Sequence, residues 1–309
     1  MSDNIKAKKI KKSMSDKTFD LILTIIVTFV LVAVLYPMIY VVSSSFSSGM
    51  AVSEGRVYLW PVDFSLEGYK WVFRNKLIWT GYTNSIIYTV LGTLLHLAMT
   101  ICVAYPLARR NYQAKGFIQK FLTASMMFGG GLIPTFILVS SLGLFNNPLY
   151  MIIGGAVGIS HAIMMRTNFQ TNVPYELLES AKMDGISDYG YLIKIVLPLS
   201  KAIISVICLY CMVGKWNSYM TPLIYLRDRE YYPLALILNE MLNKTKMSTG
   251  DMMQQEGGVV DKALQAETMK SLDGIKYALI IVSIVPMLVL YPFVQKFFEK
   301  GVTVGSIKG

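Results

Sequence analysis

Long apolar runs alternate with polar segments along most of this chain. Two of the runs lie so close together that residues 121–165 contain no Asp, Glu, Lys or Arg. Because a helix needs about 20 apolar residues to cross a bilayer, this stretch alone is long enough for two crossings. The pattern predicts six membrane-spanning helices, at residues 21–42, 82–107, 121–144, 150–165, 202–225 and 277–294.

The first apolar run follows a basic leader at residues 1–20. A positive leader before an apolar run is also typical of a cleaved signal peptide. This run is longer than the apolar part of a usual signal peptide, and no Ala-x-Ala cleavage site follows it. We therefore expect an uncleaved first span.

The charged residues are divided unevenly between the two sides that six spans would create. The four segments on the side of the N-terminus hold 17 Lys and Arg against 8 Asp and Glu. The two segments on the opposite side, 46–80 and 226–276, hold 11 of each. Because cytoplasmic loops carry the excess of Lys and Arg, we expect a multi-pass protein of the cell membrane with both termini in the cytoplasm.

The composition agrees with a membrane protein. The chain is 54% hydrophobic and 16% charged, with a mean hydropathy of +0.48. A soluble domain is about 45–50% apolar and about 25% charged, so a soluble enzyme, a disordered tail and a disulfide-stapled secreted domain are excluded. The net charge of +10 follows from the predicted topology, and nucleic acid is not expected as a partner.

The inner segment 171–201, between the fourth and fifth runs, predicts two short helices. The first carries the apolar residues Leu177, Leu178 and Ala181 and ends at Gly185, and the second starts at Ser187 or Asp188 and runs to a break at Pro198. An amphipathic helix on the inner side of a membrane protein must bury its apolar side in lipid or in a partner protein. This segment is therefore the first candidate for a functional contact.

The spacing in this segment resembles the inner loop of permease subunits of binding-protein-dependent ABC importers. That loop reads Glu-Ala-Ala, three residues, Gly, nine residues and Ile-x-Leu-Pro. Here Glu179, Ser180 and Ala181 are followed after three residues by Gly185, and after nine more by Ile-Val-Leu-Pro at 195–198. Ser180 in place of the first alanine is the one departure, and it substitutes one small residue for another.

Other segments are similar to the maltose-permease-like carbohydrate branch of that family, at 104–109, 130–134, 214–218 and 295–309. The resemblance covers about residues 20–309. It implies an all-α membrane protein with the type I ABC importer permease fold. The expected domains are the basic cytoplasmic leader at 1–20, a six-span permease domain at 21–298 and a cytoplasmic tail at 299–309.

In this family the helix before the glycine is the coupling helix, which docks on a cytosolic ATPase. It moves with the ATPase, so that the pore alternates between inward and outward access. The resemblance implies that residues 176–184 form this helix and that Gly185 supplies the sharp turn after it. The residues expected to couple the chain to the ATPase are Glu176, Leu177, Leu178, Glu179, Ser180, Ala181, Asp184, Gly185 and Pro198.

The resemblance also implies the partners. We expect a second permease in a heterodimer, two cytosolic ATPase subunits, an extracellular solute-binding protein and a sugar or oligosaccharide substrate. The sequence contains no P-loop of the form G-x4-G-K-[ST], so we expect ATP and Mg to be bound by the ATPase and no cofactor by this chain. His96 and His161 fall on separate spans without a carboxylate or cysteine nearby, so no metal site is expected.

Lys215 lies near the middle of the fifth apolar run. An ionisable residue there costs about 2.5–3.5 kcal/mol on insertion scales, so by default it faces a cavity, a partner or a substrate. A lysine suits an acidic sugar such as a uronate, but a structural pairing or a snorkelling lysine explains the residue equally well. The residues expected to contribute to the translocation path are Lys215, Trp216, Asn217, Ser218 and Tyr219.

Two other classes of protein remain as alternatives. An ion-coupled secondary carrier of a small polar solute is the first, but Asp and Glu are absent from all six predicted spans, where such carriers commonly place them. A membrane-bound enzyme is the second, and the sequence shows no nucleophile–base pair and no metal constellation. Both alternatives explain the inner segment less well than a permease subunit does.

Overall fold

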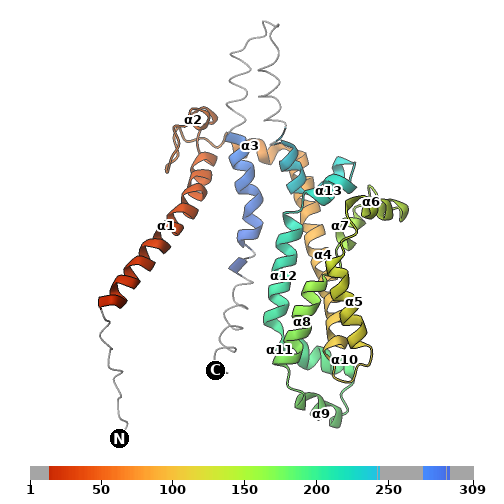
Figure 1. Ribbon diagram of the computed structural model, residues 1–309. Helices are drawn as coiled ribbons and strands as arrows, with labels where there is room; N and C mark the ends of the chain where they lie inside the picture. The colour runs from red at the N-terminus through yellow and green to blue at the C-terminus, as the bar shows by residue number, and fades with distance from the viewer. Residues whose placement is uncertain (1–13, 242, 244–273, 290, 293–309) are drawn as a thin grey trace. The chain divides into compact units, whose positions relative to one another are not determined.

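The computed structural model describes residues 14–241, 243, 274–289 and 291–292 (Figure 1). Within these residues every regular element is a helix, and the one β-bridge pairs Ser47 with Phe64. Four predicted segments fall wholly or partly outside the described residues. They are the leader, the second outer loop, the sixth span and the C-terminal tail, at 1–20, 226–276, 277–294 and 299–309.

The chain divides into two compact units, residues 1–71 with 259–281 and residues 72–258 with 282–309. The long helix of the first unit is α1 (Met14–Ser45), and none of its most apolar 18-residue window is buried. The short helix α2 (Gly49–Ser53) follows it. Because an apolar surface of this size is rare in soluble monomers, α1 has the surface of a helix that contacts lipid or another chain.

Three helices pack together in the second unit and form its core: α4 (Lys76–Ala108), α8 (Ile159–Asn172) and α12 (Lys201–Trp216) (Figure 1). We refer to them as the bundle. The buried side of α4 is rich in glycine and hydroxyl residues, such as Gly92 and Thr93. Small residues on this side let the neighbouring helices approach closely.

The remaining helices have the following bounds: α3 (Glu67–Arg74), α5 (Lys115–Met127), α6 (Leu132–Ser141), α7 (Leu149–Ile153), α9 (Glu176–Met183), α10 (Asp188–Tyr191), the π-helix η1 (Leu192–Val196), α11 (Leu197–Leu199), α13 (Met220–Tyr225), the 3-10 helix η2 (Arg229–Tyr231), a stretch at 234–241 and an apolar helix at Gly274–Val289.

Two helices of the described residues, within α1 and α4, are long and apolar enough to cross a membrane. Two bent pairs raise this number to four if each pair is one span: α5 with α6, bent by 114°, and Asp188–Leu199 with α12, bent by 79°. The described residues therefore support a multi-pass membrane protein. The total of six spans stays a prediction.

Three predicted spans are not continuous helices, contrary to the expectation from their apolar runs. The run at 121–144 is divided between α5 and α6, the run at 150–165 between α7 and α8, and the run at 202–225 between α12 and α13. Glycines in the left-handed conformation stand at the first two breaks: Gly131 has a φ of 76° and Gly155 a φ of 70°. A right-handed helix cannot continue through such a residue, whatever the hydropathy of its neighbours.

Candidate functional site

The expected coupling helix is α9, which lies at one end of the bundle within the coupling segment, residues 173–200 (Figure 1). Its end has the hydrogen bonds of a Schellman turn. The Gly185 amide donates to the Lys182 carbonyl (3.1 Å), and the Ile186 amide donates to the Ala181 carbonyl (2.9 Å). Gly185 has a φ of 71°, a conformation that glycine adopts without steric cost, so this residue makes the sharp turn after the helix.

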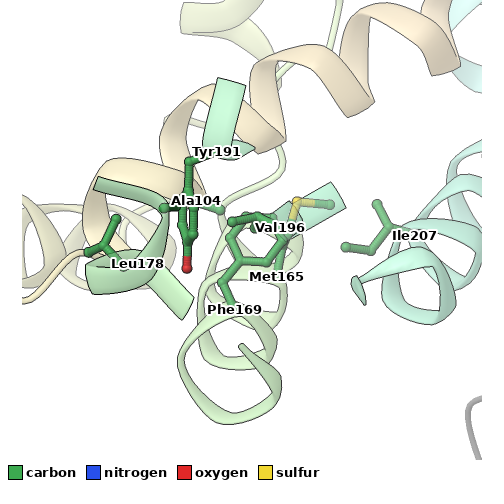
Figure 2. Close-up of a cluster of buried hydrophobic side chains, with 8 residues drawn as sticks. Ala104, Met165, Phe169, Leu178, Tyr191, Val196 and Ile207 are labelled. Carbon is green, nitrogen blue, oxygen red and sulfur yellow. The ribbon is translucent and has the colours of Figure 1, made fainter. Parts of the chain in front are cut away.

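Two side chains of α9 attach it to the bundle. Leu178 and Ala181 are buried and belong to one hydrophobic cluster (Figure 2). Burial of a leucine side chain stabilises a fold by about 1.5–3 kcal/mol, so α9 is fixed to its neighbours rather than loosely attached. The other members of the cluster come from α4, α8, α10, η1 and α12: Ala104, Met165, Phe169, Tyr191, Val196 and Ile207.

The rest of α9 is exposed. Met183 is 89% exposed, whereas Leu177, four residues before Ala181 and thus at the edge of the buried face, is 38% exposed. The polar residues expected to contact an ATPase are exposed as well, namely Glu176, Glu179, Ser180 and Asp184. The three apolar residues that the sequence placed together are therefore divided, because two of them are buried and Leu177 is partly exposed.

The coupling segment continues into α12 through a sharp bend. Ser187 caps α10 by accepting a hydrogen bond from the Gly190 amide (3.2 Å). The second expected helix thus begins where the sequence predicted, but its middle is the π-helix η1. The exposed Pro198 follows η1 and cannot donate a backbone hydrogen bond, which favours such an irregular helix. The coupling segment therefore leads from α8 directly into α12.

Arg109, just after α4, binds the coupling segment. Its guanidinium forms an ion pair with the Asp188 carboxylate and lies over the rings of Tyr105 and Tyr191, at 5.0 and 5.3 Å from their centroids. The Tyr105 hydroxyl donates to the Asp188 carbonyl (3.1 Å). Sequence reasoning included Arg109 only as part of a motif, because no local pattern reveals a partner 79 positions away.

Lys215 on α12 binds the backbone of the broken fourth run. Its Nζ donates to the carbonyls of Met151 (2.9 Å), Gly154 (3.3 Å) and Ile152 (3.4 Å). These bonds use all three N–H groups of the ammonium. The structure therefore gives Lys215 a structural pairing, with backbone oxygens as its partners.

A cavity of about 130 Å³, lined by both apolar and polar residues, lies beside Lys215. Among the described residues that line it, Lys215 is the one charged residue, and Ser218 is the other predicted path residue. The Tyr88 hydroxyl, also in the lining, donates to the Tyr231 carbonyl (2.9 Å). The remaining polar lining residues come from α4, α7 and α13: Ser85, Tyr150 and Thr221.

The other three predicted path residues do not line this cavity. Trp216 is buried, and its Nε1 donates to the Ser283 carbonyl (3.1 Å). Asn217 is the exposed C-cap of α12, and Tyr219 is 40% exposed. α12 ends at Trp216 and residues 217–219 are not helical, so the five neighbouring residues do not form one helix face.

His96 and His161, which the sequence placed on separate spans, are in contact. His96 Nε2 lies 2.8 Å from His161 Nδ1, and His96 Nδ1 lies 3.0 Å from the Gly155 carbonyl oxygen. Because a carbonyl only accepts, neutral His96 carries its proton on Nδ1, and its Nε2 accepts from His161. In the part of the chain that the structure describes, no three His, Cys, Asp or Glu side chains are arranged to hold a metal ion.

No protein-family model matches the chain, but two curated relatives from Bacillus subtilis (strain 168) match nearly all of it. The polygalacturonan/rhamnogalacturonan transport system permease protein YtcP is 36% identical over 296 residues, which cover 96% of this chain and all of that protein. Protein LplC is 34% identical over 295 residues, which cover 95% of this chain and 96% of that protein.

A similar solved structure belongs to a bacterial ABC transporter involved in the import of the acidic polysaccharide alginate. The similarity has a TM-score of 0.82 at 32% sequence identity. It covers 94% of this chain and 99% of the chain in that structure. The likeness therefore extends over the whole fold.

Proposed function

This chain belongs to the permease subunits of binding-protein-dependent ABC importers of carbohydrates, and we propose that ATP-driven motion enters it through the exposed face of α9. Membership of the family confirms three predictions: the all-α membrane fold, the role as pore-forming subunit of a saccharide importer, and ATP hydrolysis by a separate subunit. The alternative of an ion-coupled carrier is set aside on the same ground.

The division of α9 into two faces carries the proposal. Leu178 and Ala181 are packed into the bundle, whereas Met183 is exposed on the other side and Leu177 is exposed at the edge between the two faces. A protein that binds the exposed face moves the buried face with it, because the hydrophobic cluster joins α9 to α4, α8 and α12. Closure of the ATPase on ATP thereby becomes a rigid-body movement of the bundle and alternates the access of the pore.

The proposed assembly contains two permeases, two ATPase subunits and an extracellular solute-binding protein. Family membership implies an ATPase and a binding protein. The described residues hold one coupling segment, and in the proposed assembly this segment engages one of the two ATPase subunits. We therefore propose a heterodimer of this chain with a second permease, with the pore between them and the termini and coupling segment in the cytoplasm.

The docking proposal is tested with Leu177→Asp, which places a charge on the exposed face of α9. A tagged importer is purified from its membrane in mild detergent. We expect the variant to lose the ATPase by about tenfold or more and to keep the second permease, because a charge at the centre of an interface costs about 2 kcal/mol or more.

The matched control is Leu59→Asp, since Leu59 is 49% exposed and lies outside the coupling segment. Ala181→Asp is unsuitable, because Ala181 is 3% exposed and its substitution tests packing rather than docking. Recovery of the ATPase with Leu177→Asp at the level of the wild type would contradict the proposal.

We further propose that the cavity beside Lys215 belongs to the path of a saccharide that carries carboxylates. Hydroxyl groups of Tyr88, Tyr150 and Ser218 offer hydrogen bonds to sugar hydroxyls, and Lys215 contributes the positive potential. Trp216, Asn217 and Tyr219 remain proposed contributors on neighbouring faces. A relative named for polygalacturonan/rhamnogalacturonan transport and an importer of an acidic polysaccharide support this class of substrate.

Ser218→Leu tests the path because the larger side chain fills the cavity. We expect uptake of an acidic oligosaccharide to fall by about tenfold, as a clash of this size does in other binding pockets, while the ATPase still co-purifies. The control is Ser125→Leu, at an exposed position of α5. Equal uptake by the two variants would rule out a saccharide path through this cavity.

A further inference from the structure

The break in the fourth apolar run exposes backbone carbonyls within a segment that the sequence predicts to span the membrane. Between α7 and α8, residues 154–158 are not helical. The last four carbonyls of any helix lack partners within that helix. Inside a bilayer each of them must be satisfied by protein, because no water is available there.

Side chains satisfy most of the carbonyls at this break. The Tyr150 carbonyl accepts from the Gly154 amide (2.7 Å), and the Ile153 carbonyl accepts from the Ala156 amide (3.0 Å). The Gly155 carbonyl accepts from His96 on α4 (3.0 Å). The other three carbonyls, which we call the carbonyl site, accept from the single ammonium of Lys215; they belong to Met151, Ile152 and Gly154.

Because Gly92 on α4 has no side chain, the Lys215 side chain has room to reach the carbonyl site. A Cβ atom at Gly92 would lie 2.6 Å from Lys215 Cδ and 2.7 Å from Nζ, closer than nonbonded atoms approach. The adjacent Gly214 provides a contrast, because a Cβ atom there would meet nothing within 4 Å. The space around Lys215 is therefore shaped for its extended side chain.

The carbonyl site is connected both to the coupling segment and to the cavity beside Lys215, and this position links it to transport. The coupling segment joins the end of α8 to the start of α12, and Lys215, near the other end of α12, returns to the break that precedes α8. A closed loop of connected elements results, which we call the frame. It consists of α8, the coupling segment, α12 and the hydrogen bonds from Lys215 to the carbonyl site. Met151, Gly154 and Lys215 also line the cavity beside Lys215, so this frame connects α9 to the cavity wall.

We infer that Lys215 is a positioning residue for transport, whose ammonium acts as a tethered cation in the carbonyl site and holds the cavity wall to α12. The transmission of motion from α9 rests on the proposed docking of the ATPase. Three requirements follow. The site needs a cation with N–H donors, it needs the space at Gly92, and its loss lowers the uptake of neutral saccharides as well as acidic ones.

Chemical rescue tests the first requirement. Lys215→Ala removes three carbons and the ammonium, which n-propylammonium replaces. In the assembled importer, reconstituted with its binding protein, we expect the variant to lower saccharide uptake by about tenfold, within the usual range of coupling effects. We expect n-propylammonium to restore part of the uptake, and n-propanol of the same shape to restore none.

Glycine variants test the second requirement. Gly92→Ala displaces the lysine, so we expect a loss of uptake similar to that of Lys215→Ala, without rescue by n-propylammonium because the native side chain still fills the space. Gly116→Ala in α5, where a Cβ atom would meet nothing within 4 Å, is the matched control and keeps the uptake of the wild type. Equal uptake by the two glycine variants overturns the inference.

Three further results overturn it: uptake by Lys215→Ala at the level of the wild type, rescue by n-propanol as effective as rescue by the amine, and a loss restricted to acidic saccharides. If Lys215→Ala also lowers the yield of the complex, n-propylammonium must raise that yield, and an unchanged yield overturns the inference as well. Failure of ATPase docking is detected separately, because Leu177→Asp then retains the ATPase.

Discussion

At the scale of single residues, long polar side chains join elements that are distant in the sequence. Arg109 joins the end of α4 to the coupling segment through Asp188 and two tyrosine rings. Its side chain is 20% exposed, whereas that of Asp188 is 69% exposed. Because solvent screens so exposed a carboxylate, the ion pair itself contributes less to stability than the stacking and packing of the arginine.

A double-mutant cycle of Arg109→Met and Asp188→Asn separates these contributions. We expect a coupling energy between the two residues of about 0.2–1 kcal/mol, the usual range for exposed pairs. We expect Arg109→Met alone to destabilise the complex more, because it also removes the cation from two rings. Thermal denaturation midpoints of the purified complex measure both effects, and an equal loss from the two single variants would contradict the prediction.

At the scale of elements, a short helix is stable here only because its neighbours hold it. α9 has eight residues, too few for an isolated helix to be stable in water. It persists because Leu178 and Ala181 are buried in the bundle and because the turn at Gly185 satisfies its last carbonyls. Because only one face of α9 is buried, its exposed residues are available to a partner protein.

Gly185→Ala measures the contribution of this turn. A non-glycine residue at a φ of 71° is strained, so we expect a destabilisation of about 1–2 kcal/mol and weaker retention of the ATPase. Gly116→Ala in α5 is the control, since a Cβ atom there meets nothing within 4 Å and alanine favours a helix. Thermal denaturation and co-purification are measured together, and equal midpoints for the two variants would refute the role of the turn.

At the scale of the whole molecule, the distribution of charged residues along the chain indicates on which side of the membrane each connecting segment lies. The excess of Lys and Arg on the side of the N-terminus supports a coupling segment in the cytoplasm. The two outer segments together hold equal numbers of basic and acidic residues, and the first of them, 46–80, contains Trp60, which is 81% exposed. The proposed orientation therefore places Trp60 and Met183 on opposite sides of the membrane.

Labelling of single cysteines determines this orientation. The three native cysteines, Cys102, Cys208 and Cys211, are replaced by alanine, and Trp60→Cys or Met183→Cys is added. We expect a membrane-impermeant maleimide to label Trp60→Cys on intact cells and Met183→Cys only after permeabilisation. The reverse pattern would invert the proposed topology.

The sequence by itself determined the helical class, the apolar lengths and the place of the coupling segment. These features depend on local patterns: runs of apolar residues, and the fixed spacing from Glu179 through Gly185 to Pro198. A glycine that must adopt a positive φ is also a local signal, and Gly185 was recognised by its position. Such properties belong to one segment of chain and need no knowledge of its neighbours.

The tertiary structure alone decided which faces are buried and which groups are paired. The sequence did not separate Leu177 from Leu178, because the packing of α9 on the bundle decides which of them is covered. The partners of Lys215 could not be identified from the sequence for the same reason, because the carbonyls that it binds lie 61–64 positions away. A buried polar group must find a partner, but the identity of that partner depends on which helices meet, and only the folded chain determines that.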